Sequence, residues 1–319
     1  MKNNKKILIY SVILMIIGSL IFVVSMSINK WDFTKFGISK YETNTYEITQ
    51  AFEDIIINSD TFDIKFESTN DNKCKIVCIE EEKYKHDVSV QNNKLKINLI
   101  DNKKWYDYIS FGFTNPKITI YLPNNEYNSL IIELSTGDIE IPSNFQFSMI
   151  DITLSTGDVK CMANVTSSIN VTTSTGDVDL SNIYSNSINI ATSTGTVDLK
   201  NVNCDESINI KVTTGDVKLN NITCDNFIST GSTGDVVLKN LIAINKIDIK
   251  RNTGDIRFEL SDAKEIKVVT TTGDVEGTLL SNKIFLTDSD TGSIEVPKTS
   301  TGGICEITTD TGDIIISIK

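Results

Sequence analysis

One carboxylate recurs at a fixed place in the second half of the sequence, directly after a Thr-Gly pair. Ca²⁺ prefers oxygen ligands of this kind. The recurring carboxylates are Asp138, Asp158, Asp177, Asp216, Asp235, Asp255 and Asp274, with Asp313 beyond a break at Ser293. Either they form a row of cation sites, or each accepts hydrogen bonds from amides in its own turn, as Asp commonly does. We favour the turn role and expect no cofactor, with Ca²⁺ as the one candidate.

Cysteines and a histidine are the other side chains that could bind a metal. Cys74, Cys78 and His86 lack a fourth ligand and fit no standard zinc spacing, so no metal site is expected there. Cys204 and Cys224 occupy a small slot that should face inward, and we predict buried thiols. A bridge between these two remains open, because stacked residues lie about 4.8 Å apart.

Catalysis by a nucleophile would need a base held against Ser, Thr or Cys. His86 is the single imidazole, and its place after the charged segment 80–85 predicts a solvated strand end. Paired carboxylates could cleave glycosidic bonds, but aspartates that recur at the same position in eight of the ten units are explained by the repeat itself. We therefore expect no catalytic residues.

The elements that carry the aspartates repeat with a constant period. The Thr-Gly glycine recurs every 19 or 20 residues, which is typical of a solenoid. These glycines are expected to form tight turns with positive φ. They are Gly137, Gly157, Gly176, Gly195, Gly215, Gly234, Gly254, Gly273, Gly292 and Gly312.

Between the glycines, apolar and polar residues alternate. The second residue after every repeat glycine is Val or Ile, and a period of two indicates short strands with one buried face. Asn-rich stretches such as 201–203 predict a second turn in each unit. The sequence therefore predicts an all-β, single-stranded β-solenoid over residues 131–319. Its ten or so coils of 19–20 residues would make a rod about 50 Å long.

An apolar run precedes everything else. Residues 7–26 are uncharged and, as a helix, long enough to span a bilayer. Lysines before this run predict a cytoplasmic stub (1–6) and an exterior location for the rest. We favour an uncleaved transmembrane anchor; a cleaved signal peptide is the alternative, with a weak site at residues 25–27.

Two further segments flank the repeat. Residues 27–42 are predicted to be a juxtamembrane linker, and residues 43–130 a β-rich lead-in that caps the first coil. The aromatic cluster at 105–113 is either a binding loop or a cover for the open end of the core, and we favour the cover. The chain ends within a strand, Ile314–Ile318, whose unpaired edge predicts self-association.

Composition narrows the class of partner. The 319 residues carry a net charge of −12, which argues against a nucleic-acid partner. An apolar fraction of 39% is typical of a folded protein.

The segment Ile118–Pro123, Tyr127 and the Thr-Gly-Asp units resemble a bacterial family labelled "putative adhesin", a β-strand-repeat domain of unknown function. The resemblance covers roughly residues 31–319. It implies an envelope protein with an N-terminal membrane segment and a link to envelope stress, and it supplies no catalytic residues.

These observations together predict a membrane-anchored, extracytoplasmic scaffold that is adhesin-like or binds the envelope. A cell-wall polymer or an envelope protein would be its partner. A polysaccharide-active enzyme and a purely structural spacer are the alternatives.

Overall fold

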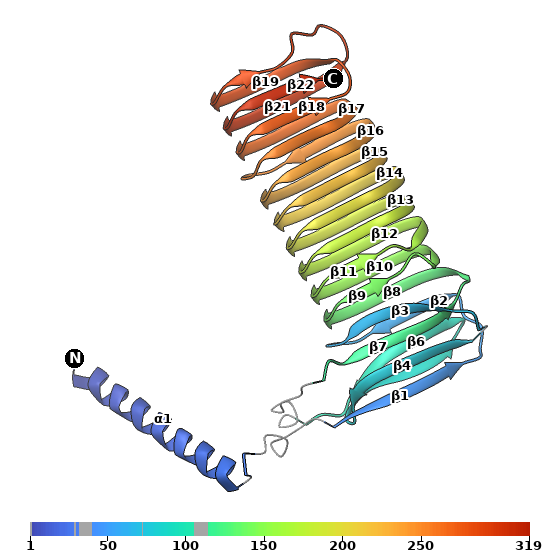
Figure 1. The fold of residues 1–319 in the computed structure, drawn as a ribbon, viewed down its shortest axis with the longest axis vertical. Helices are drawn as coiled ribbons and strands as arrows, with labels where there is room; N and C mark the ends of the chain where they lie inside the picture. Colours follow the sequence, from blue (N-terminus) through green and yellow to red (C-terminus); the bar gives the residue numbers. More distant parts are fainter. Residues whose placement is uncertain (1, 29, 32–39, 72, 105–113) are drawn as a thin grey trace.

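The computed structural model describes residues 2–28, 30–31, 40–71, 73–104 and 114–319. It contains one helix, α1 (Lys2–Ile28), followed by strands that stack into a rod (Figure 1). Within α1, residues Ile9–Ile28 have a mean hydropathy of 2.5. This stretch is long and apolar enough to cross a membrane. A signal sequence near the N-terminus would meet the same criteria of length and composition.

Twenty-two strands form the all-β part of the described residues. Five of them form the cap at one end of the rod: β1 (Tyr41–Ile48), β4 (Cys74–Glu81), β5 (Tyr84–Gln91), β6 (Lys94–Asp101) and β7 (Lys117–Pro123). The others stack along the rod: β2 (Asp54–Asn58), β3 (Asp63–Thr69), β8 (Glu126–Thr136), β9 (Ile139–Ile141), β10 (Gln146–Thr156), β11 (Val159–Cys161), β12 (Asn164–Thr175), β13 (Val178–Thr194), β14 (Val197–Thr214), β15 (Val217–Thr233), β16 (Val236–Lys250), β17 (Ile256–Thr272), β18 (Val275–Leu279), β19 (Lys283–Thr291), β20 (Ile294–Glu295), β21 (Gly303–Thr311) and β22 (Ile314–Ile318).

Equivalent residues of successive coils pair in parallel register. Val197 pairs with Val178 on one side and Val217 on the other, so equivalent apolar residues stack in an interior column. Nine of the ten Val or Ile residues that follow the repeat glycines are 0 or 1% exposed. Ile294 is the exception, at 42%, because it lies on the outermost turn.

Every coil has a corner with positive φ at its repeat glycine, and the middle coils have a second such corner. The ten repeat glycines have φ between 128° and 155°. A Cβ on Gly195 would lie 2.0 Å from the carbonyl oxygen of Gly176, so the stacking itself demands glycine. At the other corner, Asn adopts φ of 51° to 58° in four successive coils, at Asn182, Asn201, Asn221 and Asn240. The Asn-rich segments thus form the second turn.

An additional turn of the rod precedes the Thr-Gly repeat. Strands β2 and β3 pair in parallel with β8 and β9, although about 75 residues separate the partners in sequence. The cap strands β4–β7 are inserted between them and pair partly antiparallel. The cap therefore seals the rod and is not simply a lead-in to it.

The last two turns are stacked out of sequence order. Strand β21 lies between β17 and β19, and β22 lies between β18 and β20. The C-terminal strand is therefore enclosed at Ile314 and Ile315, while residues 316–318 pair with β18 alone. The predicted free edge is wrong in position, because the chain doubles back and leaves β19 and β20 outermost.

Candidate functional site

The aspartates stack along one corner of the rod in a row that is interrupted only at Thr196, and we call it the aspartate row. Each turn carboxylate accepts a hydrogen bond from the backbone N–H of the equivalent residue in the next coil: Asp177 N–H donates to Asp158 Oδ1 at 2.8 Å. Thr196 N–H donates to Asp177 Oδ1 at 2.7 Å in the same way. We expected the amide to come from the same turn. Stacking instead places the neighbouring coil's amide against the carboxylate.

The row extends one coil beyond the repeat. Asp138 N–H donates to Asp63 Oδ1 at 3.0 Å. The sequence did not reveal Asp63, because Phe62 takes the place of the glycine. At the other end, Asp313 lies between Asp274 and Ser293 and accepts from Ser293 N–H at 2.7 Å, which lowers the pKa of this carboxyl. The hydrogen bonds of the aspartate row therefore join neighbouring coils. Binding of Ca²⁺ by these carboxylates remains a prediction.

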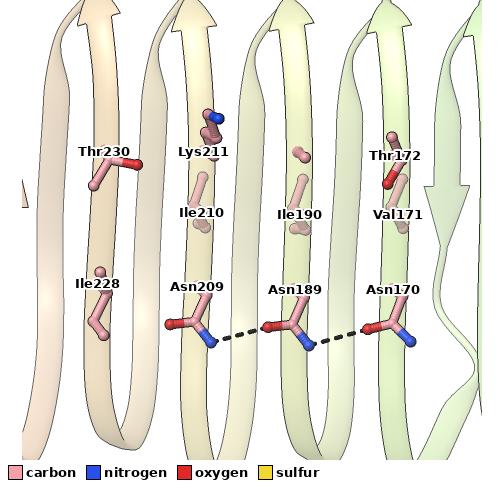
Figure 2. A pocket seen from close by; sticks show the side chains of 11 residues that line it. Asn170, Val171, Thr172, Asn189, Ile190, Asn209, Ile210, Lys211, Ile228 and Thr230 are labelled. Atoms are coloured by element: carbon pink, nitrogen blue, oxygen red, sulfur yellow. Dashed lines mark hydrogen bonds between the residues drawn. The ribbon is translucent and has the colours of Figure 1, made fainter.

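A shallow groove of about 280 Å³ lies on the side of the rod formed by β12–β15 (Figure 2). Three asparagines cross it as a ladder: Asn209 Nδ2 donates to Asn189 Oδ1 at 2.9 Å, and Asn189 Nδ2 donates to Asn170 Oδ1 at 3.0 Å. Ile228 takes the same column on the next strand and ends the ladder. The groove consists of Asn170, Val171, Thr172, Asn189, Ile190, Ala191, Asn209, Ile210, Lys211, Ile228 and Thr230.

This groove offers three amides, two hydroxyls and an amine beside apolar side chains. Each ladder amide uses only part of its hydrogen-bonding capacity, since an Asn side chain has two N–H donors and an oxygen with two lone pairs. Lys211 projects from the neighbouring outward column (Figure 2). Such a surface can hydrogen-bond hydroxyl or carboxylate groups on a ligand.

The six cysteines are buried and free. Cys204 Sγ donates to the carbonyl oxygen of Asn186 at 3.1 Å. Burial raises the pKa of Cys224 to about 12, so this thiol stays protonated. The cysteines therefore pack as small apolar side chains in this structure.

The cap holds a titratable cluster that the sequence did not predict. His86 is 3% exposed, so its predicted solvated position is wrong. Strand β5 turns it inward, where its ring meets Phe62 edge-on at 4.6 Å. Ligand atoms of Cys78, Glu80 and His86 lie within 4.8 Å of one another, whereas Cys74 is not part of this group. The aromatic cluster at 105–113 lies outside the described residues.

Parallel coils of constant length, interior columns of Val and Ile, and ladders of Asp and Asn define the chain as a single-chain parallel β-solenoid. The profile of one family, Toastrack DUF4097, matches residues 52–207 and again residues 203–319. The chain belongs to this family.

Several solved structures are similar in fold. A putative adhesin from Parabacteroides distasonis is 11% identical, with a TM-score of 0.48 over 85% of this chain and 98% of that one. A putative lipid binding protein from the same organism is 16% identical, with a TM-score of 0.48 over 88% and 98%. A putative adhesin from Bacteroides fragilis is 16% identical, with a TM-score of 0.42 over 87% and 97%. A comparison with curated proteins gave no match.

Proposed function

We propose that the protein is an adhesin-like scaffold that α1 anchors as a single-pass segment, with its solenoid outside the membrane. The observation that supports this most directly is the groove, which presents aligned polar groups across four successive strands. A repeating surface of this kind suits a repeating ligand, because each coil can meet one unit of a polymer. Binding, and not catalysis, is the role of the solenoid in this proposal.

The chemistry of the groove favours a polyhydroxylated envelope polymer that carries acidic groups. Asn189 and Asn209 can exchange hydrogen bonds with hydroxyls, and Ala191 and Ile228 offer apolar contact. Lys211 adds the one cationic side chain of the groove. A net charge of −12 would otherwise repel an anionic polymer, so the lysine gives this face a local attraction.

Binding of the detergent-solubilised full chain to purified cell-wall fractions tests this function. Lys211→Glu should weaken binding by roughly tenfold, the size expected when a favourable charge contact is reversed. Lys218→Glu is the matched control, since Lys218 is exposed on a different face of the rod. No binding by the wild type, or an equal loss in both variants, would favour the structural spacer. Release of sugars from the wall would favour the enzyme.

A link to envelope stress belongs to the same proposal. A scaffold that binds wall polymers would be needed most when the wall is damaged. Transcription of the gene should then rise under wall-active antibiotics, and a flat response would argue against the link.

A further inference from the structure

Three side chains in and next to the cap form a chain of hydrogen bonds. Ser59 follows β2, Glu80 lies on β4 and His86 lies on β5. Ser59 Oγ is 2.9 Å from His86 Nε2, and His86 Nδ1 is 2.7 Å from Glu80 Oε2. A nucleophile bonded to a base, with the base oriented by a third group, is the arrangement used in nucleophilic catalysis.

The carboxylate of Glu80 determines which ring nitrogen carries the proton. Glu80 is fully buried, and it accepts hydrogen bonds from Asn44 Nδ2 at 2.7 Å and from the His86 backbone N–H at 2.8 Å. Burial raises the pKa of Glu80, but these bonds and the one from the His86 ring outweigh it and leave the pKa lowered. An ionised carboxylate only accepts, so Nδ1 must donate. Nε2 is then free to accept from the Ser59 hydroxyl.

The imidazole is held in this orientation from several sides. Phe62 packs edge-on against the ring, with an interplanar angle of 80°. Tyr46 Oη donates to the His86 carbonyl oxygen at 2.9 Å. A base fixed by packing needs no rearrangement before it takes a proton.

Ser59 lies at the boundary between this cluster and solvent. It is half-buried and lines an open, shallow cleft of about 410 Å³. Leu99 and Leu134 supply apolar walls, and Glu133 places a carboxylate on the rim. The cleft therefore suits an uncharged or cationic substrate with a small apolar part.

A buried metal ion is the other occupant that the cluster could suggest. Only three ligand atoms of the described residues gather here, from Cys78, Glu80 and His86, whereas structural zinc sites have four ligands. Glu80 already has three donors. The hydrogen-bonded chain thus accounts for the cluster better than a metal does.

We propose that Ser59 is a nucleophile, His86 its general base and Glu80 the positioning residue of an esterase-like site for small carboxylic esters. Ser59 Oγ bonds to the carbonyl carbon while its proton passes to His86 Nε2. The ester C–O bond then breaks, and the leaving alcohol oxygen takes that proton. Water attacks the acyl-serine, gives a proton to Nε2, and Ser59 recovers it as the acid departs.

Labelling of the detergent-solubilised full chain with a fluorophosphonate probe tests the nucleophile, and p-nitrophenyl acetate tests turnover. Mass spectrometry should place the label on Ser59. Ser59→Ala should abolish labelling and lower hydrolysis by roughly 10²–10⁴-fold. Ser174→Ala is the matched control, because Ser174 is exposed on β12 and does not line this cleft, and it should change neither signal.

Substitution of Glu80 tests whether this carboxylate positions the His86 imidazole for catalysis or only stabilises the fold. Glu80→Gln should lower kcat for p-nitrophenyl acetate and leave KM unchanged, because the carboxylate orients the imidazole and does not touch the substrate. Glu80→Asp keeps a carboxylate at this position and should recover part of kcat. Absence of label on Ser59 in a protein with native circular dichroism would overturn the proposal, whether or not Glu80→Gln folds. Wall binding should be unchanged in Ser59→Ala, so failure here is distinct from failure of the scaffold role.

Discussion

Adjacent valines on β16 allow the same substitution to be placed on the two faces of one strand. Val236 is 0% exposed and pairs with Val217 and Ile256 inside the core. Val237 points outward, and its register partners are Lys218 and Arg257. Val236→Asp and Val237→Asp therefore differ only in the direction of the new carboxylate.

The two substitutions should lower the free energy of unfolding by amounts that differ by about an order of magnitude. Val236→Asp loses the burial of an apolar side chain, about 1.5 kcal/mol or more. It also places an unpaired charge in the core, about 3–5 kcal/mol. The sum of these two losses approaches the entire free energy of unfolding of many domains, which is about 5–15 kcal/mol. Val237→Asp should stay within about 0.5 kcal/mol of wild type, and its two cationic neighbours favour it.

Urea titration followed by circular dichroism measures the difference. Because a solenoid can lose coils one at a time, amide hydrogen exchange across β15–β17 should accompany the titration. We expect Val236→Asp to lower the urea midpoint and expose these three strands. Equal midpoints for both variants, or a larger loss for Val237→Asp, would refute the assignment of the inward face.

Other tests address the ends of the rod, the aspartate row, the cap and the topology. Among the described strands β19 pairs only with β21, and it exposes Ile284 and Leu286. We expect the full chain to self-associate in ultracentrifugation and Leu286→Lys to reduce this; a monodisperse wild type at high concentration would contradict it. Since the row carboxylates already accept neighbouring amides, Ca²⁺ should raise the melting temperature no more than a monovalent salt control; a specific rise would revive the cation sites. The lowered pKa of Glu80 means that its ionised form stabilises the fold, and that this stabilisation is lost as pH falls below the unfolded value of about 4.3. The stability difference between wild type and Glu80→Gln should therefore shrink from pH 5 to pH 3, and a constant difference would assign it to packing. Protease added to spheroplasts should degrade residues 31–319, and protection of this region would exclude an exterior solenoid.

The regular part of the fold was predictable because it repeats. A constant interval of 19 or 20 residues places each Val or Ile over its equivalent in the next coil, and alternation decides which face is buried. The repeat glycines likewise follow from the turn that every coil must make. Both properties are local and recur in each unit, so a single sequence suffices to reveal them.

The cluster around His86 could not be predicted in this way. Its immediate neighbours in sequence are charged, which suggested solvent. Its burial depends on Ser59, Phe62 and Tyr46, which lie 24–40 residues away and meet it only when the cap closes. No period connects these positions.

The stacking order of the last coils also could not be predicted from the sequence pattern, and only the tertiary structure shows it. Thr291-Gly292 and Thr311-Gly312 carry the same turn signal, so either could stack on Thr272-Gly273. The folded chain places Gly312 against Gly273 and moves the turn at Gly292 to the outside. Sequence therefore determined the shape and inward face of each coil, because these follow from local alternation and turn chemistry. Tertiary packing decided which coil touches which, because two coils with the same turn signal can stack in either order.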